Sequence, residues 1–260
     1  MRSYVARSWL IPLVACGCAH LHTPPGPVIA DRPGFTDTPT SLPAGAVQVE
    51  VGLTDDRFGG NRYQSAGEVL LRVGIAGPVE LRVFGNSYAT RAIPSTATVH
   101  GMEDLKVGTK IRLHAKPDSV HGLTPNLALL VATSLPTGDR DIGAGVAQPE
   151  AKLAASWTTG SPLSIFTNAG FGGVYDGTAW INHGWGSLAT WYAATPRVSL
   201  FAEGLRVHHL SGPANVSSYV DGGLTVLFGE RLQLDARIGR GVGSPVAGER
   251  FVGVGLARRF

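Results

Sequence analysis

The stretch Asp104-Leu105-Lys106-Val107-Gly108-Thr109-Lys110-Ile111-Arg112-Leu113 decides the fold. From Leu105 onward every second side chain is apolar, apart from Thr109, and the side chains between them are charged or glycine. A period of two places these sets on opposite faces of an extended strand. The same alternation recurs at 47–53, 69–75, 79–83 and 232–238. The stretch therefore predicts one strand of a larger sheet with an apolar face and a charged face.

Twelve segments of about ten residues have this character from residue 46 onward, separated by clusters of Gly, Pro, Asn and Asp. Their centres are 47–53, 68–75, 79–86, 104–113, 125–134, 150–158, 163–172, 186–194, 198–207, 219–228, 232–241 and 251–260. An even number of strands brings both ends of the chain to one side of a barrel. The sequence thus predicts an all-β protein.

Composition favours a wall in a membrane. Only 16% of the residues are charged, 35 are glycine, and no apolar run after residue 20 approaches the ~18 residues of a spanning helix. If the charged face met lipid, Arg and Lys on many strands would each cost roughly 2 to 4 kcal/mol near the midplane. We therefore expect a closed antiparallel transmembrane β-barrel of the Gram-negative outer-membrane type, with about twelve strands and its polar face inward. The alternative is a soluble or lipid-anchored sandwich or lipocalin-like barrel.

Connections of alternating length predict the topology. Tight turns are expected at 77–78, 161–162, 195–196 and 229–231, with a longer turn around Pro117. Longer polar connections are expected at 55–66, 89–102, 136–148, 174–183, 208–218 and 243–249. Outer-membrane barrels have short periplasmic turns and longer outer loops. Both termini are therefore expected in the periplasm of a bacterial outer-membrane protein.

The N-terminus is predicted to be a targeting segment, residues 1–19, with Arg2 and Arg7 before a short apolar run. Residues 13–16 (Leu-Val-Ala-Cys) resemble a lipobox, in which Cys16 would carry lipid; ordinary cleavage after Ala19 is the alternative. We expect residues 20–45 to form an N-terminal periplasmic extension and residues 46–260 to form the transmembrane β-barrel.

Chemistry in the body of the chain is expected to be sparse. Both cysteines, Cys16 and Cys18, lie in the targeting segment, so the folded body has no thiol for catalysis or metal binding. His183, His208 and His209 lack a carboxylate at ligand spacing, so no metal and no cofactor are expected. Ser156 or Ser187 with His183 would be the pairing of a barrel hydrolase, the less favoured alternative to a protein without enzymatic activity. Basic residues are scattered and the net charge is only +3, so no nucleic-acid partner is expected.

The inward set defines the candidate lumen. A twelve-stranded barrel lies between filled eight-stranded barrels and open sixteen-stranded porins, so its lumen should be narrow. These charges would either satisfy one another as an internal network or select solutes. A separate set of aromatic residues is expected in an interfacial girdle: Trp157, Trp180, Trp185, Trp191 and Tyr192. The lumen-lining candidates are Glu50, Glu68, Arg72, Glu80, Arg82, Lys106, Lys110, Arg112, Lys152, Glu203, Asp221, Asp235 and Arg237.

Both ends of the chain resemble a known family. The last strand, 251–260, looks like the terminal strand by which outer-membrane barrels are recognised for insertion, with Phe260 as the signal and Arg258 as a departure from the apolar pattern. The stretch 31–39 (Asp-Arg-Pro-Gly-Phe-Thr-Asp-Thr-Pro), with 42–45 and 48–50, resembles the opening of the outer-membrane transporter-like family named for the MetA pathway of phenol degradation. Residues 232–235, 239–241 and 251–255 resemble its ending, and 101–108 and 135–138 also match.

The resemblance implies a barrel that acts as a transporter, with no catalytic residues to carry over. We therefore expect a channel for small solutes, with hydrophobic or aromatic compounds suggested by the family name. The alternative is a non-conducting lipid-anchored barrel with a structural or surface-interaction role. Outer-membrane lipid and the barrel-assembly machinery are the expected partners, and the solute is unknown.

Overall fold

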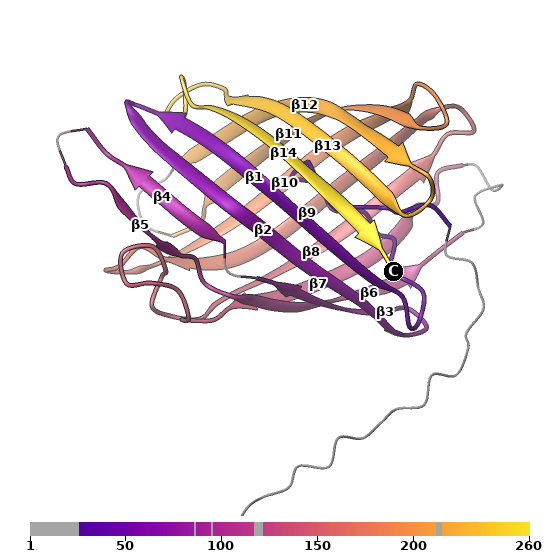
Figure 1. Ribbon diagram of the computed structural model, residues 1–260, viewed down its shortest axis with the longest axis horizontal. Coiled ribbons are helices and arrows are strands. Elements are labelled where there is room, and N and C mark those ends of the chain that lie inside the picture. Colours follow the sequence, from indigo (N-terminus) through magenta and orange to yellow (C-terminus); the bar gives the residue numbers. More distant parts are fainter. Residues whose placement is uncertain (1–25, 86, 95, 117–121, 212–214) are drawn as a thin grey trace, which may run out of the picture.

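The computed structural model describes residues 26–85, 87–94, 96–116, 122–211 and 215–260. Residues 1–25 lie outside the described part, so the predictions for the targeting segment, Cys16 and residues 20–25 are not addressed by it. Antiparallel strands wrap into a tilted barrel (Figure 1). The described residues include no helix long and apolar enough to cross a membrane. The strands are β1 Val47–Phe58, β2 Asn61–Ala76, β3 Val79–Phe84, β4 Tyr88–Ala92, β5 Val99–Met102, β6 Lys106–His114, β7 Asn126–Ser134, β8 Gln148–Thr158, β9 Leu163–Tyr175, β10 Trp180–Ala193, β11 Val198–His209, β12 Val216–Phe228, β13 Leu232–Gly241 and β14 Arg250–Arg259.

The barrel is closed and has twelve strands around its wall, as predicted. β1 pairs with both β2 and β14, which closes the wall. β3 and β4 pair with successive parts of β2 and make one interrupted wall strand; β5 and β6 make the next. Each described strand apart from β5, which pairs with β4 alone, therefore has a hydrogen-bonded neighbour on both sides, as a strand in hydrocarbon requires.

The wall has apolar side chains on its outer face and polar side chains on its inner face, the reverse of a soluble protein. Large apolar side chains point outward and are exposed, among them Leu53 at 53%, Leu188 at 57% and Ile238 at 68%. Polar side chains point inward and are buried, including Gln48, Glu50 and Glu80 at 0%. A continuous apolar exterior of this kind suits lipid and not water. The predicted exception, Thr109, satisfies its outward hydroxyl by donating to the Glu80 carbonyl, with an oxygen–oxygen distance of 3.0 Å.

Several connections predicted to be long are instead strands. β1 continues to Phe58 and β2 begins at Asn61, so the interval 55–66 is mostly a hairpin closed by Gly59 and Gly60, both with positive φ. Similarly, β4 and β5 occupy much of 89–102, and β9 and β10 extend into 174–183. Beyond the hydrocarbon both faces of a strand meet water or headgroups, so the apolar alternation ends although the backbone pairing continues. The intervals 135–147 and 242–249 remain the extended connections on this side.

Candidate functional site

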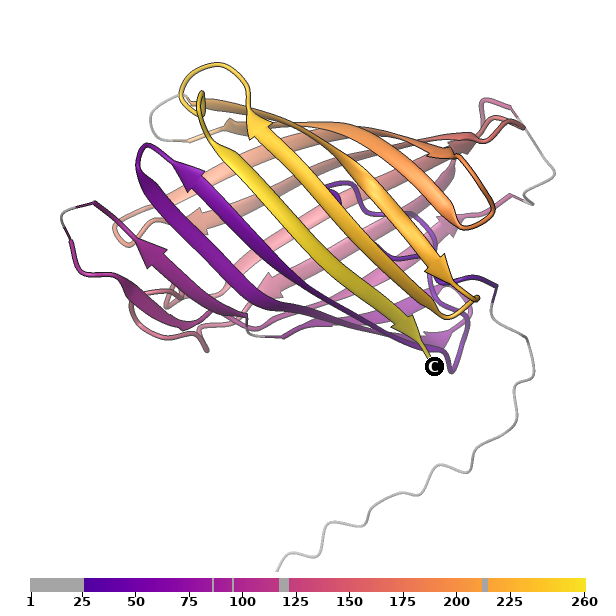
Figure 2. The same cartoon turned by 45° about the horizontal axis from the view of Figure 1, so that its top comes forward.

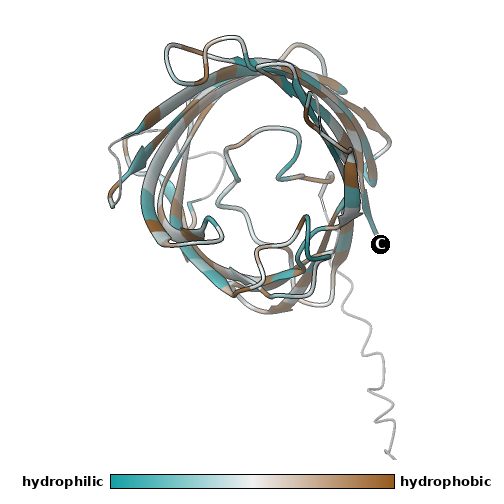
Figure 3. Ribbon diagram, turned by 90° about the vertical axis from the view of Figure 1, so that its left-hand side faces the viewer, coloured by the Kyte–Doolittle hydropathy of each residue, from teal (hydrophilic) through white to brown (hydrophobic). Residues whose placement is uncertain are grey.

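The N-terminal segment 26–45 lies inside the barrel. The view along the barrel shows this chain crossing the lumen (Figure 3), and it is the indigo segment within the wall in Figure 2. It enters beside the turn between β12 and β13, where Val28 N donates to Glu230 O (2.7 Å), and leaves beside β2, where Gly45 N donates to Gly74 O (2.9 Å). The prediction of a periplasmic extension is therefore wrong for residues 26–45. We call these residues the lumen segment.

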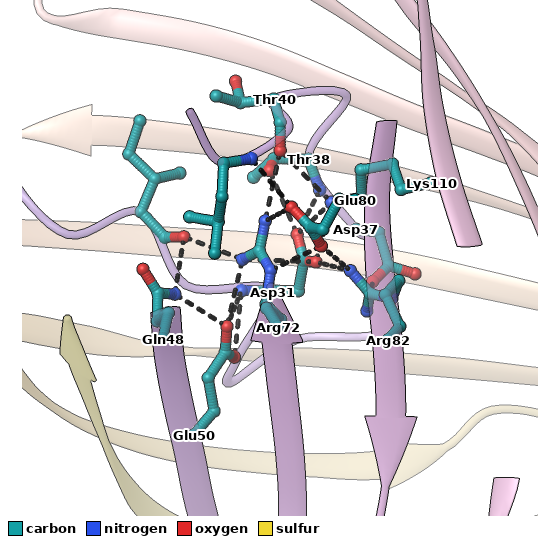
Figure 4. Close-up of polar contacts among 12 residues, drawn as sticks. Asp31, Asp37, Thr38, Thr40, Gln48, Glu50, Arg72, Glu80, Arg82 and Lys110 are labelled. Atoms are coloured by element: carbon teal, nitrogen blue, oxygen red, sulfur yellow. Dashed lines mark hydrogen bonds and ion pairs between the residues drawn. The ribbon is translucent and has the colours of Figure 1, made fainter. Parts of the chain in front are cut away.

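Asp31 is the electrostatic centre of the lumen segment. Lys110 Nζ lies 2.8 Å from Asp31 Oδ2, Arg72 Nη1 lies 3.4 Å from the same oxygen, and Arg82 donates to it as well (Figure 4). The four side chains come from three wall strands and the lumen segment, and all are buried. Arg72 and Arg82 also pair with Glu80, whereas Lys110 has no other ion-pair partner in the described part of the chain. Lys110 therefore depends on Asp31, because a buried charge requires a partner.

Wall carboxylates bind the backbone of the lumen segment. Glu50 accepts hydrogen bonds from Asp31 N (3.1 Å) and Arg32 N (3.2 Å), and Glu80 accepts one from Leu42 N (2.9 Å). Glu203, on the opposite wall, accepts from Phe35 N and Thr36 N at 2.5 and 3.0 Å. A segment without secondary structure must find partners for its buried N–H groups, and these carboxylates supply them.

Asp37 extends the contacts to β8 and β9. Its carboxylate pairs with Arg82 Nη2 at 3.2 Å and with Lys152. Its backbone exchanges two hydrogen bonds with the Asn168 amide, with Asp37 N to Oδ1 at 2.8 Å and Nδ2 to Asp37 O at 3.0 Å. Contacts from β1, β2, β3, β6, β8, β9 and β11 therefore hold the lumen segment on both sides of the lumen.

The Arg32 side chain lies beside a β-bulge in β2 and packs against two glycines. At Gly67 and Glu68, both with positive φ, the register of β2 shifts against β1 and directs Glu68 to Arg32, with Nη1 to Oε2 at 2.6 Å. Arg32 lies against Gly52 and Gly255, where an added Cβ would come within 2.1 and 2.4 Å of its guanidinium. Any side chain at either glycine would displace Arg32.

Phe35 places the lumen segment next to the beginning of β14. Its ring meets Phe251 edge-on at 5.6 Å between centroids and Tyr219 at 6.2 Å. The Arg237 guanidinium lies 5.3 Å from the Phe35 centroid and 5.2 Å from that of Phe251. Cation–π contacts of this kind hold an aromatic tip in place.

The lumen segment borders two chambers. One, of about 500 Å³, is lined by mixed charges that include Glu68, Glu103, Lys106, Glu150 and Arg237, with carboxylates in excess over basic groups. The other, of about 270 Å³, lies toward the end where the chain enters and is lined by Pro27, Val28, Phe166, Trp191 and other residues. Because the lumen segment contributes to both linings, it stands between them.

The structure brings most of the predicted inward residues to the lumen segment. Lys106 instead pairs with Glu150 (3.2 Å), Asp221 lies 3.9 Å from Arg237 Nη1, and Arg112 forms no ion pair within the part of the chain described. Asp235 lies 3.7 Å from Arg32, a weak contact. Those that contact the lumen segment directly are Glu50, Glu68, Arg72, Glu80, Arg82, Lys110, Lys152, Glu203, Asp235 and Arg237.

Other participants were not among the lumen-lining candidates: Asp31, Arg32 and Asp37 in the lumen segment, and Gln48, Asn168, Ser187 and Arg259 in the wall. The stretch 31–39 had been singled out only for its resemblance to a family. Its three charges, in a region otherwise rich in Pro and Thr, are the signal that could have found them.

The five aromatic residues predicted to form an interfacial girdle point to different sides of the wall. Trp157, Trp180 and Tyr192 point outward, but Trp185 and Trp191 face the lumen, where Trp191 stacks on Phe201 at 5.0 Å; the girdle prediction is wrong for these two.

The residues of the predicted hydrolase pairing do not meet. Ser187 and His183 lie on β10 four residues apart, roughly 13 Å at a strand's rise. Ser187 accepts a hydrogen bond from Thr36 Oγ1 at 2.8 Å, and Ser156 is near Asn126. His183 thus contacts neither serine.

Solved structures show the same fold. The COG4313 outer membrane channel from Pseudomonas putida F1 is similar with a TM-score of 0.69 and 14% identity, over 88% of this chain and 99% of that one. The NanC porin has a TM-score of 0.57 and 8% identity over 81% and 98%. The translocator domain of the autotransporter NalP from Neisseria meningitidis has 0.55 and 13% over 83% and 88%. At these identities the likeness establishes an outer-membrane type of barrel.

A search of the curated proteins found no match. The sequence profile of one family matches residues 30–260, which includes the lumen segment from Ala30 together with the whole wall. This agrees with the resemblance noted at both ends of the sequence. The chain belongs to the family described as "Putative MetA-pathway of phenol degradation".

Proposed function

We propose that this protein is a channel for small solutes in the bacterial outer membrane and that the lumen segment closes its pore. The observation that carries the proposal is the position of residues 26–45 between two chambers of a closed barrel. The contacts of this segment reach strands on both sides of the lumen. Conduction therefore requires the lumen segment to move, and its own ion pairs set how easily it does so.

The lining of the smaller chamber supports a small aromatic solute. Phe166 and Trp191 offer ring faces beside the apolar Val28, with Ser164 and Thr225 as hydroxyl partners. An apolar site with a few polar groups is the usual environment for a small organic ligand. The family description, which names phenol degradation, agrees with this class.

A disulfide lock tests the closing role. Thr36 Oγ1 and Ser187 Oγ are 2.8 Å apart, so Thr36→Cys and Ser187→Cys should form a disulfide in a background without Cys16 and Cys18. We expect planar-bilayer conductance of the full-length protein to fall at least about tenfold on oxidation and to recover on reduction, because the lock forbids displacement of the segment.

Matched controls separate the possible outcomes. Asn126 and Ser156 face each other on β7 and β8, so Asn126→Cys with Ser156→Cys places a disulfide within the wall and should leave conductance unchanged. Conductance that survives the 36–187 lock would show that solutes pass beside a stationary segment. A wild-type protein without conductance in any solute would favour the structural or surface-interaction role.

Liposome swelling tests the solute class. Phenyl glucoside should enter faster than methyl glucoside, and Trp191→Ala should remove that difference without abolishing entry of either sugar. Equal rates for both compounds in the wild type would contradict an aromatic preference.

A further inference from the structure

Four arginines form a row on the outside of the barrel. Arg62 on β2 is paired directly with Arg57 on β1, Arg57 with Arg250 on β14, and Arg250 with Arg240 on β13. Directly opposed residues of antiparallel strands point to the same face with Cβ atoms about 4.5 to 5.5 Å apart. The neighbouring outward positions hold Leu53, Ile238 and Val252, so this face is the lipid side of the wall.

The positive charge of this row is only partly neutralised. Asp55 pairs with Arg57 (Nη2 to Oδ2, 3.0 Å) and with Arg62 (Nε to Oδ1, 2.6 Å). Within the described residues, Arg240 and Arg250 form no ion pair, and both are exposed. Like charges directly opposite one another on a sheet are destabilising, so an anion from outside the chain would stabilise the facing pair Arg240 and Arg250.

A groove lies beside the row. It has a volume of about 570 Å³, and its lining combines Arg57, Arg240 and Arg250 with the apolar Val220, Ile238 and Val252. Asp55 also lines it, as the partner of Arg57, so the net charge at this end is positive. The groove therefore offers a cationic end and an apolar length to the same ligand, which is the shape of an amphiphile with an anionic headgroup.

The position of the row along the strands indicates which lipid layer it meets. Arg57 and Arg240 are each one residue from the end of their strands, Arg62 is the second residue of β2, and Arg250 opens β14. This end is opposite the end at which the chain terminates. With both termini periplasmic, the row lies at the level of the headgroups of the outer leaflet.

We propose that Arg57, Arg62, Arg240 and Arg250 bind the phosphate groups of lipid A, the phosphorylated glycolipid of the outer leaflet, with an acyl chain along Val220, Ile238 and Val252. Guanidinium groups form paired hydrogen bonds to phosphate oxygens, and a row on four strands spans more than one phosphate. The site faces away from the lumen and is separate from the proposed channel.

Native mass spectrometry of the full-length protein in detergent tests the site. Titration with bisphosphorylated lipid A should give a retained adduct, and Arg240→Gln with Arg250→Gln should weaken it at least about tenfold, as expected for the loss of two charged hydrogen-bond donors. Monophosphorylated lipid A should bind more weakly, and phosphatidylglycerol and inorganic phosphate should give no retained adduct at the same concentration.

The control variant removes the same charge elsewhere on the outer face. Arg206 lies on β11 and Arg258 near the other end of β14, both exposed, and Arg206→Gln with Arg258→Gln should bind lipid A as the wild type does. Heat-modifiable mobility in gels verifies that each variant is folded. Equal weakening in the two double variants, or equal retention of phosphatidylglycerol and lipid A by the wild type, would overturn the proposal. Conductance should be unchanged in the Arg240 and Arg250 variant, so failure here is distinguishable from failure of the channel.

Discussion

At the scale of single residues, one carboxylate organises the lumen. Asp31 meets Arg72, Arg82 and Lys110, while Glu50 binds its backbone N–H. Burial of this carboxylate is tolerated because three cations surround it, and Lys110 has no other ion-pair partner among the described residues. The same residues therefore determine both the order of the lumen segment and the ease with which it leaves.

Removing this charge should loosen the lumen segment. Asp31→Asn leaves Lys110 without a carboxylate, whereas Arg72 and Arg82 keep other ion-pair partners. Breaking a buried pair from one side costs about 3 to 5 kcal/mol. We expect more frequent channel openings in planar bilayers and faster proteolysis within 26–45. Asp176→Asn, in the exposed turn between β9 and β10, is the matched control and should resemble the wild type.

Removing a cation together with Asp31 should restore part of the stability that the lumen segment loses in Asp31→Asn. Asp31→Asn with Lys110→Met deletes both members of a buried pair, which is much less costly than deleting one. A double variant as loosely closed as Asp31→Asn alone would contradict the assigned role of the pair.

At the scale of elements, the connection 242–249 folds against the wall at the end opposite the termini. Val246 is buried and packs against Gly241, and Glu249 receives a hydrogen bond from Tyr219 Oη at 3.4 Å. Burial and the neighbouring Asp56 raise the pKa of Glu249 from its ordinary value to about 7. The folded connection therefore favours the protonated form of Glu249.

The sign of the pH dependence follows from that shift. Between the ordinary pKa of a glutamate and about 7, the folded connection binds more protons than the unfolded one, so its stability falls as the pH rises. A spin label at Ala247 should be more mobile at pH 8 than at pH 5, and Glu249→Gln should flatten the change. The same pH response in Glu249→Gln would assign it to another group; Glu230→Gln, near the opposite end, should leave the response intact.

The last strand closes the barrel through its final residues. Phe260 N donates to Val47 O (2.9 Å), and Arg259 donates to the Gln48 side chain (3.0 and 3.1 Å). Deleting Phe260 should slow assembly, because it removes this backbone bond and the apolar end of the predicted insertion signal. Pulse-chase assays of heat-modifiable folding measure the rate, and Phe260→Trp, which keeps an aromatic end, should assemble normally. Normal assembly of the deletion would contradict the insertion role.

At the scale of the whole molecule, the orientation in the membrane remains a prediction. Cysteine at Arg140, in the connection 135–147, should react with an impermeant maleimide on intact cells, whereas cysteine at Arg231, beside the entry of the lumen segment, should not. Both sites are exposed, so access alone decides the result. The background lacks Cys16 and Cys18, and its export must be verified first. Labelling at Arg231 alone would reverse the topology.

The sequence by itself determined the wall. Twelve strands, and the faces they turn to lipid and lumen, follow from an alternation that is local to each segment, so residues such as Leu53, Glu80 and Lys110 could be assigned without neighbours. Strands could not be predicted from the sequence in regions where the alternation of apolar and polar residues stops. The outer parts of β1 and β2 were expected as a loop, because strand pairing beyond the hydrocarbon leaves no apolar period.

Only the tertiary structure decided what fills the lumen. Residues 26–45 have no periodicity, and their partners are far away in the chain: Glu50 for Asp31, Asn168 for Asp37 and Glu203 for Thr36. Each inward charge could equally have met water or a charge on the next strand. Closure of the barrel brought these side chains around one irregular segment, whose unpaired N–H groups and buried carboxylates required them.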